Sequence, residues 1–300
     1  MESIIEILAR ELDCRGQYVE NIIKLLDEGN TVPFIARYRK ELHGGMDDQR
    51  IRTLADRLAY LRNLQARREE VKGAIENQGK LTEELAAAID GAATLAEVED
   101  LYRPYRQKRR TRATMAKEKG LEPLALLLFA QEKDCPDPLA EAARYVDPEK
   151  GVDTAEAALQ GASDIVAELV SDDADLRKAL RALYWRKARL VSAAAAKEPE
   201  DTVYRLYYDF SAPLSRVQGH QVLAINRGER EEILKVSVDM DREEALVSVR
   251  RAVVKPGSAA MDFVKGAAED AYDRLIAPSL EREIRSDLTE RADEGAIGQF

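Results

Sequence analysis

The segment DDQRIRTLADRLAYLRNLQARREEVKGAIENQ, at residues 47–78, carries the strongest structural signal in the chain. Its apolar residues recur every three or four positions, which is the spacing of one face of an α-helix. Asp47 and Asp48 suit the positive N-terminal end of a helix, and Asn77-Gln-Gly79 stops it. The segment therefore predicts one long amphipathic helix whose apolar stripe comprises Ile51, Leu54, Leu58, Leu61 and Leu64.

The composition extends this prediction to the whole chain. Of the 300 residues, 34% are charged and only 6% are aromatic, which is typical of helical proteins with solvated outer faces. We expect a mainly α, multi-helical fold with at most one short strand or hairpin. That strand is placed near 233–238, where ILKVSV alternates with period two.

Three short helices are predicted before the long one. Apolar residues have helical spacing from Ile4 to Leu12 and from Val19 to Leu26, and a third helix starts at Pro33, which suits a first helical turn. Short helices joined by tight turns can form a helix-turn-helix-like unit over residues 1–45, and a plain helical hairpin with a third packing helix gives the same pattern.

Further helices are expected across residues 46–198, including two Ala-rich ones at about 153–171 and 173–196. The second carries Trp185, which we expect to be buried. A composition shift near residue 198 separates a last region, 199–300, that contains the strand and a long helix from 260 to about 285, which Pro278 should kink or end. The predicted organisation is thus an N-terminal unit over 1–45, a helical domain over 46–198 and a helical region over 199–300.

A basic segment interrupts this acidic chain: LYRPYRQKRRTRA at residues 101–113, followed by MAKEKGLEP at 115–123. Residues 101–120 include eight basic residues and one acidic residue, a local charge of +7, whereas the whole chain carries −10 at neutral pH. Pro104 disfavours a helix at Arg103, so we expect an extended or turn-like stretch. The charge asymmetry suggests contact with a polyanion or an acidic partner. The alternative is a solvated loop that pairs with the protein's own acidic helices.

Residues for catalysis or metal binding are scarce. The chain has two histidines, His43 and His220, and two distant cysteines, Cys14 and Cys135. These exclude a multi-histidine metal site and a disulfide framework, and no phosphate-binding glycine loop or nucleophile elbow occurs. We expect no enzyme activity, no cofactor and no metal. The N-terminus has no signal-peptide pattern and no uncharged stretch approaches the ~20 residues needed to span a bilayer, so a cytoplasmic protein without membrane contact is expected.

Several segments together resemble the N-terminal half of the bacterial Tex transcription accessory proteins. They are NTVPFIARYRKE at 30–41, RLAYLRNL at 57–64, EDLY at 99–102, KRRTRA at 108–113, KGLEPL at 119–124 and HQVLAINRGE at 220–229. In that family the basic loop usually reads LYLPYKPKRR, whereas this chain has Arg103, Arg106 and Gln107 in place of the second Leu, the Lys and the second Pro. The resemblance implies nucleic-acid binding and association with transcription. It also implies downstream RNase H-like, helix-hairpin-helix and OB-fold domains, which lie beyond the point where this sequence stops.

The function predicted from sequence is a non-enzymatic, helical N-terminal module of a transcription accessory protein, with weak nucleic-acid affinity of its own. The alternative is a scaffold that docks RNA polymerase or its own downstream domains without touching nucleic acid. A nuclease fragment is a third, less favoured class. The candidate nucleic-acid contacts are Arg103, Arg106, Lys108, Arg109, Arg110, Arg112, Arg37, Arg39 and Lys40.

Overall fold

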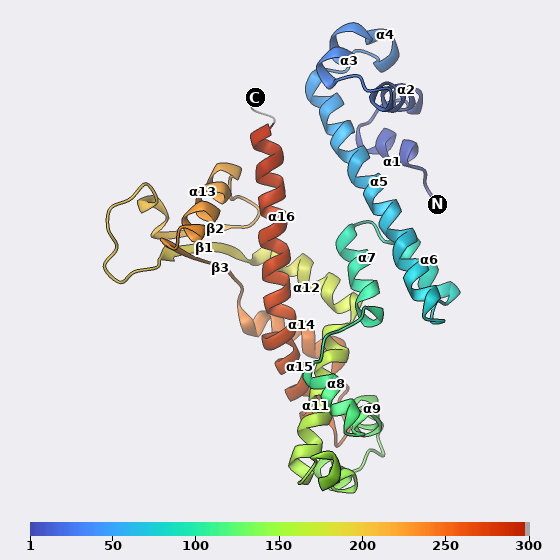
Figure 1. Cartoon of the computed structure of the whole chain (residues 1–300), viewed down its shortest axis with the longest axis vertical. Coiled ribbons are helices and arrows are strands. Elements are labelled where there is room, and N and C mark those ends of the chain that lie inside the picture. The colour runs from blue at the N-terminus through green and yellow to red at the C-terminus, as the bar shows by residue number, and fades with distance from the viewer. Residues whose placement is uncertain (298–300) are drawn as a thin grey trace. The chain divides into compact units, whose positions relative to one another are not determined.

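A computed structural model describes residues 1–297 of the chain, with side chains for 1–294, and consists mainly of helices (Figure 1). The mainly α fold class is confirmed. The chain forms two compact units that divide between Arg106 and Gln107, and each unit has its own apolar core. The three-part division at 1–45, 46–198 and 199–300 stays a prediction, and residues 298–300 of its last part lie outside the described residues.

Unit 1, which ends at Arg106, contains seven α-helices and a closing 3₁₀ turn among its residues. They are α1 (Ile4–Glu11), α2 (Gly16–Asp27), α3 (Val32–Tyr38), α4 (Lys40–His43), α5 (Asp48–Asn77), α6 (Glu83–Gly91), α7 (Leu95–Tyr102) and η1 (Arg103–Tyr105). The three short helices predicted before the long one are confirmed, with α4 as an additional turn. The helix-turn-helix-like interpretation of their arrangement stays a prediction.

The 30-residue helix α5 organises unit 1, as the sequence predicted. Asp47 caps it by accepting a hydrogen bond from the Arg50 amide at 2.8 Å, and all five residues of the predicted stripe are buried. Burial of each such leucine or isoleucine stabilises the fold by ~1.5–3 kcal/mol. α1, α2, α3, α6 and α7 all pack against this helix.

Unit 2 begins at Gln107 and contains the remaining elements. Its helices are α8 (Arg112–Glu118), α9 (Glu122–Ala130), α10 (Pro138–Ala142), α11 (Ala155–Ser171), α12 (Ala174–Lys187), α13 (Gly219–Arg230), α14 (Arg242–Val253), α15 (Met261–Asp270) and α16 (Ala277–Ile297). Short 3₁₀ turns lie at η2 (Ala143–Tyr145), η3 (Pro148–Lys150) and η4 (Arg205–Tyr207), and a π-helical segment, η5, spans Ala271–Ile276. α11 contacts α8, α9 and α15, which places it at the centre of the helical part of the unit.

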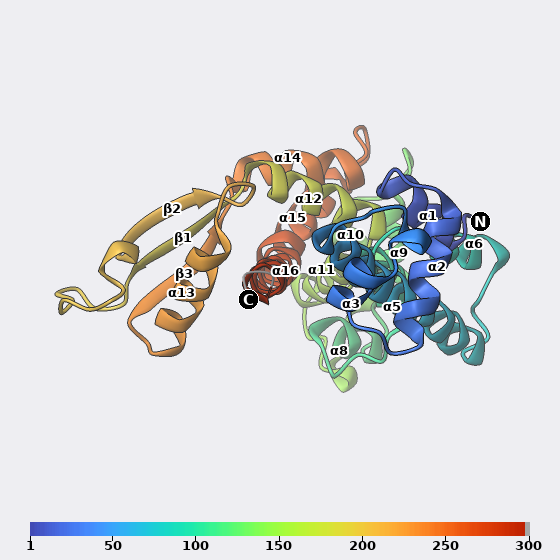
Figure 2. The same ribbon diagram turned by 90° about the horizontal axis from the view of Figure 1, so that it is seen from above.

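A small antiparallel sheet projects from these helices, with strand order β2–β1–β3. Its strands are β1 (Arg189–Ala194), β2 (Asp209–Pro213) and β3 (Leu234–Asp239), with Val191 opposite both Ser211 and Ser237. α13 packs against β3 and α16 (Figure 2). The strand predicted near 233–238 is therefore confirmed as β3.

The central strand β1 corrects the helix predicted over 173–196. That helix ends at Lys187, and Ala188 turns the chain into an extended conformation, with ψ of 162°. Alanine-rich composition favours a helix, but pairing with strands on both sides of 189–194 overrides this local preference. Trp185 is half-buried rather than buried, and the Arg291 guanidinium lies 4.2 Å from its ring centroid.

Pro278 does not end the long C-terminal helix, which was one of the two outcomes that we expected. It occupies the first turn of α16, directly after the π-helical segment, and the helix continues to Ile297. Because proline lacks an amide hydrogen and its ring clashes with the carbonyl four residues earlier, a wider turn before it removes both conflicts. The π-helical segment accommodates the proline without breaking the helix.

Candidate nucleic-acid interface

The first part of the basic segment, up to Arg106, belongs to unit 1 and is held by its own acidic and aromatic residues. Arg103 lies half-buried in the 3₁₀ turn with helical angles of φ −49° and ψ −45°, so the extended alternative predicted for it is wrong. Arg106 bonds to Glu99, and its guanidinium lies 5.5 Å from the Tyr102 ring centroid. Glu99 also accepts a 2.5 Å hydrogen bond from Arg67. The charge of Arg106 is therefore neutralised locally.

Glu99 is the residue that holds this end of the segment. Partial burial on its own would raise the pKa of Glu99, but hydrogen bonds and the positive charges of Arg67 and Arg106 keep that pKa below its usual value. The carboxylate is thus ionised at neutral pH and pairs with two guanidinium groups.

Lys108 opens the part of the segment that belongs to unit 2, and it too is paired. Its ammonium lies 2.8 Å from Oε1 of Glu168, on α11, and also contacts Asp172, the residue that follows α11. Thr111, the cap of α8, donates a 3.0 Å hydrogen bond to the other oxygen of Glu168. All three charged side chains are mostly buried, so Lys108 fixes the loop to α11 rather than facing solvent.

The arginines that follow Lys108 differ in whether an acidic residue pairs with them. Arg110 lies 3.3 Å from Glu118 in a pair that is largely exposed, and such pairs contribute at most ~1 kcal/mol. Arg109 and Arg112 are exposed, and within the part of the chain that the structure describes neither has an ion-pair partner. The predicted loop is thus partly neutralised by its own acidic neighbours and partly available to solvent.

The second group of candidates lies on α3 and α4 in unit 1. Arg37 and Lys40 are exposed, and Arg37 lies 5.9 Å from the ring centroid of Tyr38. Arg39 joins the two helices, with its Nε 3.6 Å from a Glu41 oxygen. The structure brings Arg37 and Lys40 to one shallow groove, together with Phe34, but Asp47 and Asp48 line the same groove.

Sequence reasoning did not select the aromatic pair beside these cations. Phe34 is 42% exposed and Tyr38 is 60% exposed, with ring centroids 5.2 Å apart. Both residues have the spacing of one face of the third helix, but only Ile35 of that helix is buried among its described residues. The signal that could have found them is the direct alternation of aromatic and basic residues in FIARYRK.

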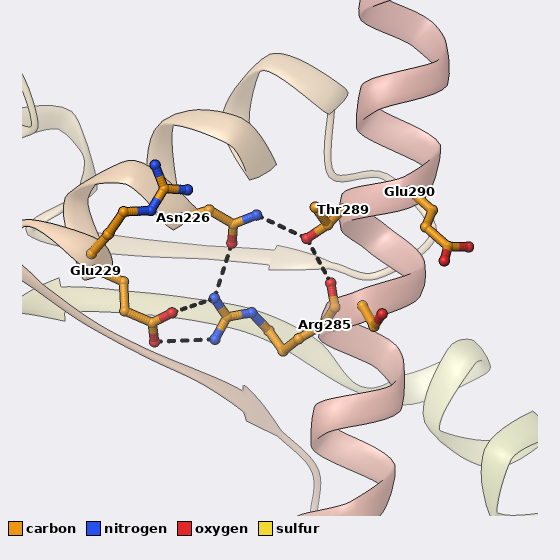
Figure 3. A pocket seen from close by; sticks show the side chains of 7 residues that line it. Asn226, Glu229, Arg285, Thr289 and Glu290 are labelled. Atoms are coloured by element: carbon orange, nitrogen blue, oxygen red, sulfur yellow. Dashed lines mark hydrogen bonds and ion pairs between the residues drawn. The ribbon is translucent and has the colours of Figure 1, made fainter.

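The hollow between α13 and α16 is polar, and several of its lining residues bond to one another (Figure 3). Arg285 donates hydrogen bonds to Glu229 at 2.8 and 3.2 Å and to Asn226 at 3.0 Å. Asn226 in turn donates to Thr289 at 2.8 Å. This network fastens α13 to α16 and engages Asn226, Glu229 and Arg285.

Neither histidine forms part of a site in the described structure. His43 is buried, and its Nδ1 accepts a 2.9 Å hydrogen bond from the Met46 amide, while His220 is exposed at the start of α13. Among the described residues, no three His, Cys, Asp or Glu side chains are grouped closely enough to hold a metal ion. The same residues include no helix with the length and apolarity to cross a membrane.

Comparison with protein families identifies the chain. A family model described as the Tex-like protein N-terminal domain matches residues 2–76, and one described as Tex central region-like matches residues 133–300. The chain belongs to the Tex family. The sequence resemblance is therefore confirmed, and the basic segment lies between the two matched Tex regions.

Similar Tex relatives are known from several organisms. The chain is 45% identical to the Bacillus subtilis protein named "Uncharacterized protein YdcI" over 98% of its own length and 41% of the relative. It is 37% identical to the "Transcriptional accessory protein Tex" of Neisseria gonorrhoeae, over 99% of its own length and 40% of the relative. A human protein named "S1 RNA-binding domain-containing protein 1" is 29% identical over 99% of the chain and 31% of the relative. The chain thus spans about two fifths of the bacterial relatives.

Proposed function

We propose that this chain is the N-terminal region of a transcription accessory protein and that it binds the phosphate backbone of nucleic acid weakly through Arg109 and Arg112. The supporting observation is that these two guanidinium groups are exposed and have no acidic partner in the described structure. A guanidinium donates paired hydrogen bonds to a phosphate, so an unpaired, exposed arginine is well suited to this ligand. The names of the gonococcal and human relatives, which refer to transcription and to RNA binding, also support this proposal.

The paired cations have a different part in this proposal. Arg106 is held by Glu99, and Lys108 is held by Glu168 and Asp172, so binding of these cations to phosphate would first break those interactions. We assign them to positioning the loop. The net charge of −10 repels a polyanion, which keeps the affinity low and makes it strongly dependent on salt.

A protein-docking function is the second candidate, and a separate surface favours it. Val203 and Leu206, on the connection between β1 and β2, are 85% and 83% exposed. Exposed apolar side chains of this size are common at protein interfaces. RNA polymerase and the downstream domains implied by the family resemblance are the proposed partners of this surface.

The experiment that tests the first proposal is a fluorescence anisotropy titration with labelled single-stranded and duplex oligonucleotides at low salt. The variant Arg109→Gln/Arg112→Gln should weaken binding by about tenfold for all sequences alike, because phosphate contacts carry no sequence information. The matched control is Arg205→Gln/Arg227→Gln, which changes the net charge equally at exposed arginines that pair with Asp201 and Glu231. Equal weakening in both variants would show that the loss of affinity comes from net charge alone, and it would contradict direct contacts by Arg109 and Arg112.

The docking candidate has its own test. Val203→Ser/Leu206→Ser should abolish binding to purified RNA polymerase in biolayer interferometry while leaving oligonucleotide affinity unchanged. Unchanged polymerase binding in that variant would reject this surface.

We also propose that the chain catalyses nothing by itself, because the two histidines and two cysteines of the chain are dispersed. Nuclease and ATPase assays with Mg²⁺ and Mn²⁺ test this. Turnover that copurifies with the protein and disappears on a point substitution would contradict it.

A further inference from the structure

A small hollow on unit 2 brings Arg112 of the basic segment together with Lys119. It is lined by Arg112, Met115 and Lys119 from α8 and the residue after it, by Gly151 after η3, and by Gln160 and Asp164 of α11. Its volume of about 230 Å³ is below the ~300–1,000 Å³ typical of sites for drug-sized ligands. The size favours a small anion or one group of a larger molecule.

Two glycine turns place a second lysine, Lys150, close to Lys119 and next to the residues that line this hollow. Gly120 and Gly151 have φ of +78° and +82°, a conformation that glycine adopts without strain. A Cβ atom built on Gly120 would lie 3.3 Å from Lys150 Nζ, and one on Gly151 would lie 3.8 Å from Lys119 Cε. Each lysine side chain therefore lies beside the glycine turn that follows the other lysine, and the two side chains are close together.

These cations lack the neutralisation that is common elsewhere in this chain. Among the described residues, Arg112, Lys119 and Lys150 have no ion-pair partner, in contrast to Lys108 a few residues away, which contacts two carboxylates. Asp164 lines the hollow, but it accepts a 3.1 Å hydrogen bond from Gln160. Like charges held close together repel one another, and a bound anion would convert that repulsion into attraction.

We propose that this hollow binds a phosphate group, held by Arg112, Lys119 and Lys150. The guanidinium supplies a planar pair of donors, and the two ammonium groups supply point charges that can approach other oxygens of the same phosphate. A phosphate of nucleic acid and a free phosphate offer the same chemistry. The site shares Arg112 with the proposed function but goes beyond it, because Lys119 and Lys150 complete it and neither Arg109 nor affinity for oligonucleotides is required.

Inorganic phosphate is the first probe. We would label the lysine amines of the whole chain with ¹³C-methyl groups, which keeps their charge, assign the signals with Lys119→Arg and Lys150→Arg, and titrate phosphate against chloride at constant ionic strength. The expected result is a saturable shift of the Lys119 and Lys150 signals with phosphate only. The variant Lys119→Gln/Lys150→Gln should bind phosphate at least about tenfold more weakly, whereas the control Lys133→Gln/Lys235→Gln, at exposed lysines outside the hollow, should bind it like the parent.

An oligonucleotide titration of the same variants distinguishes the source of the phosphate. If the backbone of nucleic acid occupies the hollow, Lys119→Gln/Lys150→Gln reduces the slope of log K against log salt by about 2, one for each lost lysine. If the chain binds phosphate but no oligonucleotide, the ligand of the hollow is a free phosphate. That result rejects the proposed nucleic-acid function and leaves the phosphate site in place. Oligonucleotide binding without a saturable phosphate shift, or equal phosphate binding in the two double variants, would overturn the phosphate site.

Discussion

Gly161 of α11 permits a close approach in the core of unit 2, and its replacement by alanine gives a measurable prediction. A Cβ atom at this position would lie 2.3 Å from Leu121 Cδ1 and 3.4 Å from Ala116 Cβ. Leu121 is only 1% exposed, so a shift of its side chain would disturb its packing in the core. Overpacking of this kind costs ~1–3 kcal/mol. Alanine is favoured over glycine in a helix by ~0.5–1 kcal/mol, which offsets part of that cost.

The control is Gly266→Ala in α15, where nothing lies within 4 Å of the added atom, so that only the helical gain remains. Gly161→Ala should therefore be ~1–3 kcal/mol less stable than Gly266→Ala. Urea unfolding followed by the fluorescence of Trp185, the single tryptophan of the chain, measures the stability of unit 2 directly. In a Leu121→Ala background the penalty of Gly161→Ala should vanish, because the clashing atom is gone. Equal stability of the two alanine variants, or the same penalty in the Leu121→Ala background, would refute this reasoning.

Two further predictions concern α16, and both are measured by the same unfolding assay. Burial and the neighbouring Glu283 raise the pKa of Asp287, so its charge destabilises the fold at neutral pH. Asp287→Asn should therefore raise the free energy of unfolding at pH 7. This gain should vanish as the pH falls toward the pKa of ~3.8 that the group has in the unfolded chain. A gain that grows as the pH falls would contradict this sign. Arg285→Ala should cost ~1–3 kcal/mol because it leaves Glu229 and Asn226 without their donor, and Arg285→Lys should recover only part, since an ammonium lacks the guanidinium fork. Full recovery with lysine would show that charge alone matters.

The helices with a clear apolar stripe and a polar cap were predictable from sequence. α5 begins at its aspartate cap and buries the predicted stripe, and Thr82 and Thr94 cap α6 and α7 by accepting hydrogen bonds from Leu85 and Glu97. Caps and stripes are local properties, so a window of about ten residues contains the information. These elements therefore follow from the chain without tertiary context.

β1 shows where local information ends. Its sequence, RLVSAA, continues an alanine-rich run, and it becomes a strand because β2 and β3 pair with it from positions about 20 and 45 residues later. The candidate interface likewise depends on residues that are distant in sequence. Charge asymmetry located the basic segment, but the carboxylates that neutralise Lys108 lie 60 and 64 residues away, on α11 and directly after it. Sequence could therefore propose nine cations without showing which ones are already paired.

The central claim is that Arg109 and Arg112 contact nucleic-acid phosphates, and the salt dependence of binding tests it most directly. Oligonucleotide affinity of the parent chain should fall with a slope of roughly −3 to −4 in log K against log salt, as expected for ~3–5 neutralised phosphates. In Arg109→Gln/Arg112→Gln the slope should be shallower by about 2, whereas in Arg205→Gln/Arg227→Gln it should match the parent. A parent without affinity at low salt, or an unchanged slope in the Arg109→Gln/Arg112→Gln variant, would contradict the claim.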